Sequence, residues 1–125
     1  MPRITTMTNV FINREKKYRM MVDFKKAIEK IPCEKGDFVM ADFQDEAFML
    51  FGEDASSPCA SIEITVIDEV AEKYDRALLE QVLVEMTEIF MSYVPIPEDR
   101  IFAFYRGAPL WTYQKKNIIG NLLQL

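Results

Sequence analysis

The residue that could do chemistry most directly is Pro2, which stands just before a β-branched run, ITTMTNV at 4–10. An initiator methionine before a small residue is usually removed, and its removal would leave Pro2 with a free secondary amine. An amine whose pKa lies near the working pH can accept a proton and return it. The alternative is that a proline in this position only protects the terminus. Pro2 is therefore either a general base or a residue without a chemical role.

Other reactive groups are few, because the chain of 125 residues contains no histidine. This absence excludes Ser-His-Asp and Cys-His hydrolases and every metal centre with histidine ligands. The acidic residues are scattered without the spacing of a calcium loop, and the four glycines are too isolated to form a phosphate-binding loop. We expect no metal and no cofactor, and chemistry that uses an amine, a carboxylate, a thiol or a phenol.

The composition predicts one globular domain over residues 1–125, with 50% hydrophobic residues and a net charge of −5. The negative charge argues against nucleic acid as a partner. No apolar run approaches the roughly 18 residues of a membrane span, and no secretory signal is recognisable. Cys33 and Cys59 do not make a disulfide framework, which favours the cytoplasm. Export without a signal peptide stays open.

Hydrophobic periodicity predicts the elements that must position Pro2. Strands are expected at 3–10, 37–45, 60–67 and 101–105. A first helix should run from a cap at Asn13 to about Lys30, with Tyr18, Met21, Phe24 or Lys25, Ile28 and Ile31 along one side. A second and longer helix is expected from about Val70 to Tyr93, with its apolar stripe at Leu78, Leu79, Val82, Leu83, Met86, Ile89, Phe90 and Tyr93. The basic residues at 14–19 alternate with acids and suit a solvated helix face.

The predicted order is β-α-β followed by a second β-α-β, which indicates two similar units side by side. Such a chain forms an α+β fold, a four-stranded sheet with two antiparallel helices on one face. The opposite face of the sheet must then be buried elsewhere. The C-terminal segment from Trp111 is also too apolar for a tail in water, so we expect the chain to associate with itself.

Four stretches of sequence, taken in order, point to a known family. They are MPRITTMTNV at 1–10, FMLFG at 48–52 followed by PCA at 58–60, the apolar strand that ends at Ile67, and PEDRI at 97–101. With them, the chain resembles the macrophage migration inhibitory factor (MIF) family, including D-dopachrome tautomerase, over nearly its whole length. Trp111 falls where the dopachrome enzyme has its tryptophan.

The resemblance implies a homotrimer, with the sheets around a central channel, in which an N-terminal proline catalyses keto–enol tautomerisation. The implied substrate is a small aromatic α-keto acid, such as phenylpyruvate, or a similar carbonyl compound, and no membrane or nucleic acid is involved. The chemistry fits Pro2, because an α-amino group titrates near pH 8 (about 7.7–8.0) and an apolar pocket lowers that pKa toward neutrality. Apolar residues at the matching positions are Phe38, Val66, Ile67, Phe102, Phe104 and Trp111.

The sequence departs from the family where a lysine after the first helix holds the substrate carboxylate. An ungapped alignment puts Glu34 at that position, with Lys35 one residue later. Lys35 takes the role if the turn shifts by one residue, and otherwise it is an ordinary turn residue. Arg3 is a second candidate cation, although strand alternation directs it away from Pro2.

A second departure lies in the last main strand, where the family's neighbouring subunit supplies a tyrosine and an asparagine. Phe102 and Phe104 stand at these positions and offer no hydrogen bond, so they would stabilise a developing enolate poorly. Both are alternatively ordinary core or interface residues. Cys59 lacks the second cysteine of the family's C-x-x-C pair, which argues against thiol–disulfide chemistry. These departures leave two hypotheses: a tautomerase, or a catalytically weak trimer that binds a protein partner as cytokine-like relatives do.

Overall fold

The computed structural model describes residues 2–32 and 34–118. The regular elements, in chain order, are β1 (Arg3–Thr8), α1 (Arg14–Ile28), the 3₁₀ turn η1 (Gly36–Phe38), β2 (Met40–Gln44), β3 (Ala60–Ile67), α2 (Asp68–Lys73), α3 (Arg76–Tyr93), the 3₁₀ turn η2 (Glu98–Arg100), β4 (Ile101–Ala108), β5 (Thr112–Tyr113) and β6 (Lys116–Asn117).

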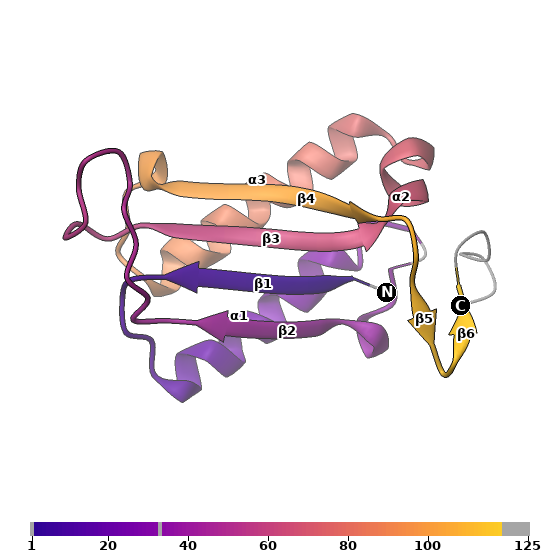
Figure 1. Cartoon of the computed structure of the whole chain (residues 1–125), viewed down its shortest axis with the longest axis horizontal. Helices are drawn as coiled ribbons and strands as arrows, with labels where there is room; N and C mark the ends of the chain where they lie inside the picture. The colour runs from indigo at the N-terminus through magenta and orange to yellow at the C-terminus, as the bar shows by residue number, and fades with distance from the viewer. Residues whose placement is uncertain (1, 33, 119–125) are drawn as a thin grey trace.

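Four strands form one sheet in the order β2-β1-β3-β4 (Figure 1). β1 is parallel to β2 and β3 is parallel to β4, whereas β1 and β3 run antiparallel. Each parallel pair is joined through helix, α1 in the first half of the chain and α2 with α3 in the second. The duplicated β-α-β order predicted from the sequence is therefore confirmed.

The long helices α1 and α3 cover the same face of the sheet, and the opposite face is left open (Figure 1). Side chains alternate along each strand, so every second residue points into the core between sheet and helices. The fully buried core side chains include Ile4, Phe24, Ile28, Ile62, Ile64, Val66, Val82, Met86 and Phe90. The expected inward face of the 60–67 strand, with Ile62, Ile64 and Val66, is thus confirmed.

The first helix begins as predicted, because the Asn13 side chain accepts a hydrogen bond from the Lys16 amide (2.8 Å). Its predicted stripe is confirmed at Phe24, Ile28 and Ile31, which are fully buried. It is wrong in the first half of the helix, where Tyr18 is 70% exposed and Met20 is the buried residue. Met20 and Phe24 are four residues apart and lie on one face of the helix, and Tyr18 and Met21, three residues apart, would also lie on one face. Because both pairs fit helical spacing, the spacing alone does not decide which of them faces the core.

The long second helix is in fact two helices, α2 and α3, which separate at Tyr74. Asp75 causes the break, because its carboxylate accepts a hydrogen bond from the Ala77 amide (3.0 Å) and so starts a new helix. Tyr74 adopts an extended backbone at the end of α2. The predicted stripe holds in α3, which buries Leu79, Val82, Met86 and Phe90.

Other predicted boundaries also shift, and the first strand ends at Thr8 rather than at residue 10. The second strand begins at Met40 rather than at residue 37, because Gly36–Phe38 form a 3₁₀ turn. The last main strand continues beyond residue 105 to Ala108. From the C-terminal apolar segment, β5 and β6 form a hairpin, while 119–125 lie outside the described residues. None of the helices in the described ranges is long and apolar enough to span a membrane.

Candidate active site

Pro2 is buried immediately before β1, at the end of the sheet where β2 also begins. Its carbonyl oxygen accepts a hydrogen bond from the Met40 amide (3.2 Å), next to the paired residues Arg3 and Met40. The pyrrolidine ring fixes φ, and the strand ladder fixes the residue that follows. Pro2 is therefore held in a defined direction.

A cavity of about 440 Å³ opens beside Pro2 and is formed by three separate segments. The start of β1, the stretch from η1 into β2, and the beginning of the C-terminal hairpin meet there, and Figure 1 shows that hairpin beside the end of the sheet where β1 starts. The lining residues are Pro2, Arg3, Asp37, Phe38, Val39, Met40, Trp111, Thr112 and Tyr113. Three residues predicted from the sequence, Pro2, Phe38 and Trp111, thus line one cavity.

Aromatic rings form much of the cavity wall. Phe38 and Tyr113 meet edge to face, with ring centroids 5.6 Å apart and planes at 81°. Trp111 is partly buried against the core, and its carbonyl oxygen accepts a hydrogen bond from the Ile118 amide (3.0 Å). The aromatic part of this wall suits a planar apolar ring, while Arg3 and Asp37 add charged groups to the same cavity.

Thr112 and Tyr113 were not predicted as site residues, because the hairpin that carries them is not recognisable from its residue types. Its turn residues Gln114 and Lys115 have positive φ angles of 53° and 66°. Turns of this kind usually contain Asn-Gly or Asp-Gly, and Gln-Lys is not among their signatures. The β5–β6 pairing, Thr112 with Asn117 and Tyr113 with Lys116, became visible only in the structure.

Of the two candidate cations, Arg3 lines the cavity of Pro2 and Lys35 does not. Arg3 lies on the open face of the sheet, as strand alternation predicts, yet it still borders this cavity. Its Nη2 atom is 3.7 Å from Oδ1 of Asp42, with both side chains partly exposed. An exposed pair of this kind is weak, so Arg3 can exchange Asp42 for an anionic ligand at little cost.

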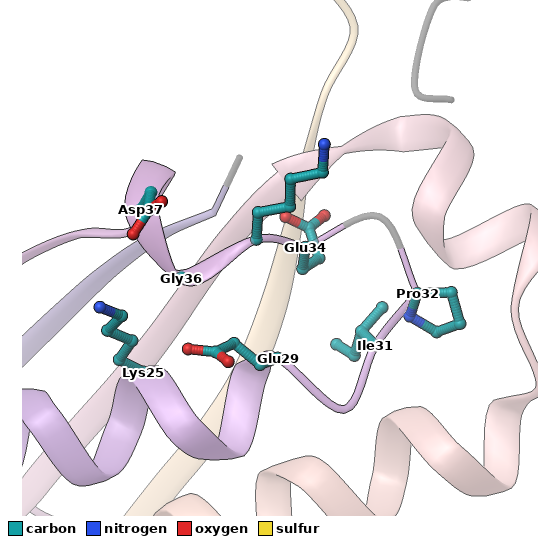
Figure 2. Close-up of a pocket in the computed structure, with 8 residues that line it drawn as sticks. Lys25, Glu29, Ile31, Pro32, Glu34, Gly36 and Asp37 are labelled. Atoms are coloured by element: carbon teal, nitrogen blue, oxygen red, sulfur yellow. The ribbon is translucent and has the colours of Figure 1, made fainter. Parts of the chain in front are cut away.

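Lys35 belongs to a second and larger cavity of about 620 Å³, which meets the first at η1, where Asp37 lines both. Figure 2 shows Lys25 of α1 and Glu29, the residue just after α1, reaching toward Gly36. A Cβ atom on Gly36 would lie 2.1 Å from the Glu29 carboxylate and 2.4 Å from Lys25 Cε, so the absence of a side chain makes room for both. Pro2 does not line this larger cavity, and we place the candidate site in the smaller one.

Glu34 also lines the larger cavity and is only 3% exposed. Burial raises the pKa of its carboxyl group. Burial and, secondarily, the charge of Glu34 raise the pKa of Tyr105, whose hydroxyl donates to the Leu79 carbonyl (2.8 Å). The acidic residue that the alignment set at the family's lysine position is therefore turned into the protein.

The remaining predicted site residues do not line the Pro2 cavity within one chain. Val66 and Ile67 are buried in the core. Phe102 and Phe104 lie on the open face of the sheet, 60% and 37% exposed, and their strand register sets them level with Met7 and Thr5. Any contact between these phenylalanines and a ligand at Pro2 would require a second copy of the chain.

Cys59 is a buried free thiol, as expected of a small core residue, and Cys33 lies outside the described residues. Within the two described ranges, His, Cys, Asp and Glu side chains nowhere gather in a group of three or more that could hold a metal ion.

Comparison with solved structures identifies the fold. MIF2 of Leishmania major superposes with a TM-score of 0.81 at 19% identity, covering 94% of this chain and 97% of that one. MIF from Toxoplasma gondii gives 0.78 at 15% identity, over 92% and 98% of the two chains. A MIF homologue from Prochlorococcus marinus gives 0.74 at 19% identity, over 92% and 97%.

The chain has the MIF fold. The resemblance inferred from the sequence is therefore confirmed for the fold. No protein-family model matches the chain, and no curated protein matches it with statistical significance. At such low identity the likeness concerns backbone architecture alone. In this MIF fold the proline that follows Met1 lies in the wall of an aromatic cavity.

Proposed function

We propose that this protein is a keto–enol tautomerase of the phenylpyruvate or dopachrome type, with the nitrogen of Pro2 as general base and acid. The observation that carries the proposal is the burial of Pro2 in the wall of an aromatic cavity, on a backbone of the MIF fold. The proposal requires Pro2 to be the first residue, because a peptide bond to Met1 removes the lone pair on which the chemistry depends.

In the proposed reaction, the neutral Pro2 amine takes the hydroxyl proton of an enol, and the resulting ammonium delivers a proton to the enol carbon next to the one that becomes the carbonyl. No atom is gained or lost, and the reverse path uses the same groups. The aromatic wall supports this role, since removing water from an amine disfavours its charged form and lowers its pKa toward neutrality.

The substrate that we propose is a small aromatic α-keto acid or a similar carbonyl compound. Phe38, Trp111 and Tyr113 offer surfaces for an aromatic ring, and Arg3 is the cation that borders the same cavity. We further propose a homotrimer. The exposed Phe102 and Phe104 on the open face support this assembly, which would bring them into contact with another copy.

The test is the change in phenylpyruvate absorbance, followed for the Met1-free protein and for Pro2→Gly, with intact mass verifying the terminus of each. The proposal predicts that the substitution lowers kcat by roughly a hundredfold or more, the usual contribution of a general base. Thermal unfolding at the wild-type temperature would show that the loss is chemical. Unchanged turnover would eliminate Pro2 as the base.

A second candidate function is a catalytically weak trimer that binds a partner protein. It is favoured by the buried Glu34 at the family's lysine position and by the location of Lys35 outside the Pro2 cavity. Turnover at the efficiency of an ordinary enzyme would rule this out as the sole role, whereas inactive but folded Met1-free protein would support it.

A further inference from the structure

A groove separate from the Pro2 cavity runs along the outer side of α3. It has a volume of about 450 Å³ and is lined by Val84, Thr87, Glu88 and Met91 of α3 together with Glu98 and Asp99 of η2. The four α3 residues are spaced three and four apart, so they form one stripe on the helix. This stripe differs from the buried stripe of Leu79, Val82, Met86 and Phe90, by which α3 packs on the sheet.

The floor of the groove is apolar. Met91 is partly buried and packs against the core, which fixes its position. Val84 is 57% exposed and offers its apolar side chain to the groove. The two side chains are seven residues apart, about two helical turns, and Thr87 and Glu88 lie between them on the same stripe.

The rim of the groove is acidic. Glu88, Glu98 and Asp99 have no ion-pair partner anywhere in the described chain. Residues 77–99 contain no lysine or arginine at all. The adjacent Arg100 is turned toward another loop, where its guanidinium donates to the carbonyls of Pro58 (2.7 Å) and Ser57 (3.2 Å) and lies over the Phe51 ring. The three carboxylates are therefore uncompensated.

We propose that this groove binds a basic amphipathic segment of a partner protein. An apolar side chain of that segment would pack against Val84 and Met91 in the groove, and flanking lysine or arginine side chains would pair with Glu88, Glu98 and Asp99. The proposal rests on charge complementarity around an apolar floor, the usual arrangement for a helix in a groove. It is independent of Pro2, since the groove and the Pro2 cavity share no residue.

The test measures fluorescence anisotropy of a labelled peptide of about 15 residues, made of Lys, Leu and Ala in an amphipathic helical pattern. Two control peptides carry Glu in place of Lys, or Ser in place of Leu. We expect only the Lys/Leu peptide to bind, with an affinity that falls as salt is added. No binding, or equal binding of the Ser peptide, would overturn the proposal.

Matched variants locate the site. The double variant Glu98→Lys/Asp99→Lys should weaken binding roughly fivefold or more, because two ion pairs become repulsions. Glu53→Lys/Glu72→Lys changes the net charge equally at exposed positions outside the groove and should alter the affinity less than about twofold. Equal weakening by both variants would show only a general charge effect. A change in oligomeric state seen only with Glu98→Lys/Asp99→Lys would assign the groove to a second copy of the chain. Either result, equal weakening or this change, would overturn the proposal.

Discussion

The ring of Phe38 meets the ring of Tyr113 edge to face, at 5.6 Å between centroids. Phe38 belongs to η1 and Tyr113 to the C-terminal hairpin, which are separated by most of the chain. The contact joins these segments beside Pro2, and both residues line the cavity there. The short hairpin β5–β6 is therefore part of the candidate site.

Replacing Tyr113 tests the importance of this contact. We expect Tyr113→Ala to raise KM for phenylpyruvate roughly two- to tenfold, the equivalent of one aromatic pair, because the wall of the cavity opens. Tyr113→Phe keeps the ring and should stay near the wild-type value. Tyr18→Ala removes an exposed tyrosine of α1 and serves as control. The assignment of the cavity would be wrong if Tyr113→Ala left KM unchanged.

The proposed trimer predicts a mass in solution three times that of the 14.6 kDa chain, measurable by light scattering. Phe102→Asp should shift the protein toward monomer, since a charge on the open face would be buried without a partner in the assembly. Tyr18→Asp, at an exposed position on α1, should leave the mass unchanged. A wild-type monomer at micromolar concentration would contradict the proposed assembly.

The hydrogen bonds to the Asp45 carboxylate lead us to expect a loss of stability in acid. The Ile12 amide (2.9 Å) and the Lys17 ammonium (2.8 Å) both donate to its carboxylate, and these bonds hold the pKa of Asp45 below its usual value. The pKa of Asp45 is lower in the folded than in the unfolded protein. The stability that its ionised carboxylate contributes is therefore fully present above the unfolded pKa of about 3.9, and it is lost as the pH falls through the folded pKa.

Asp45→Asn should therefore lower the free energy of unfolding by about 1–3 kcal/mol at pH 7, measured by denaturant titration. The difference between the variant and the wild type should shrink as the pH falls below about 4. A difference that stayed constant down to acidic pH would show that the carboxylate charge does not matter.

Two phenylalanines provide a test of the core. Phe90 is fully buried on α3, and Phe90→Ala should cost about 3–5 kcal/mol of unfolding free energy. Phe48 is 93% exposed, and Phe48→Ala should change stability by less than about 0.5 kcal/mol in the monomer. A similar cost for both, in protein shown to be monomeric, would contradict the orientation of α3.

The sequence was sufficient for the parts of this fold that local physics determines. Asn13 caps α1 as predicted, and the alternation of Ile62, Ile64 and Val66 identifies the inward face of β3. Both follow from short-range rules, a side-chain oxygen that meets a free amide and a two-residue repeat. The break at Asp75 was missed because the apolar stripe continues through it.

The candidate site was harder to predict, because it forms from distant segments. Motifs shared with the MIF family pointed to Pro2, Phe38 and Trp111, which the fold brings to one cavity. Tyr113 carried no signal, since its hairpin turn lacks the usual Asn-Gly or Asp-Gly. Strand alternation counted against Arg3 as a ligand-binding cation, because it directs the side chain away from Pro2. A residue at the end of a strand can nevertheless border a cavity on either side of the sheet, and Arg3 does so.

The most direct test of the account compares the phenylpyruvate tautomerase rates of two preparations, one beginning at Pro2 and one carrying a single extra residue before it. Both contain every residue of the cavity and differ only in whether the Pro2 nitrogen has a free lone pair. We predict that the extended protein is slower by roughly a hundredfold or more while unfolding at nearly the same temperature. Equal rates in the two preparations would contradict it.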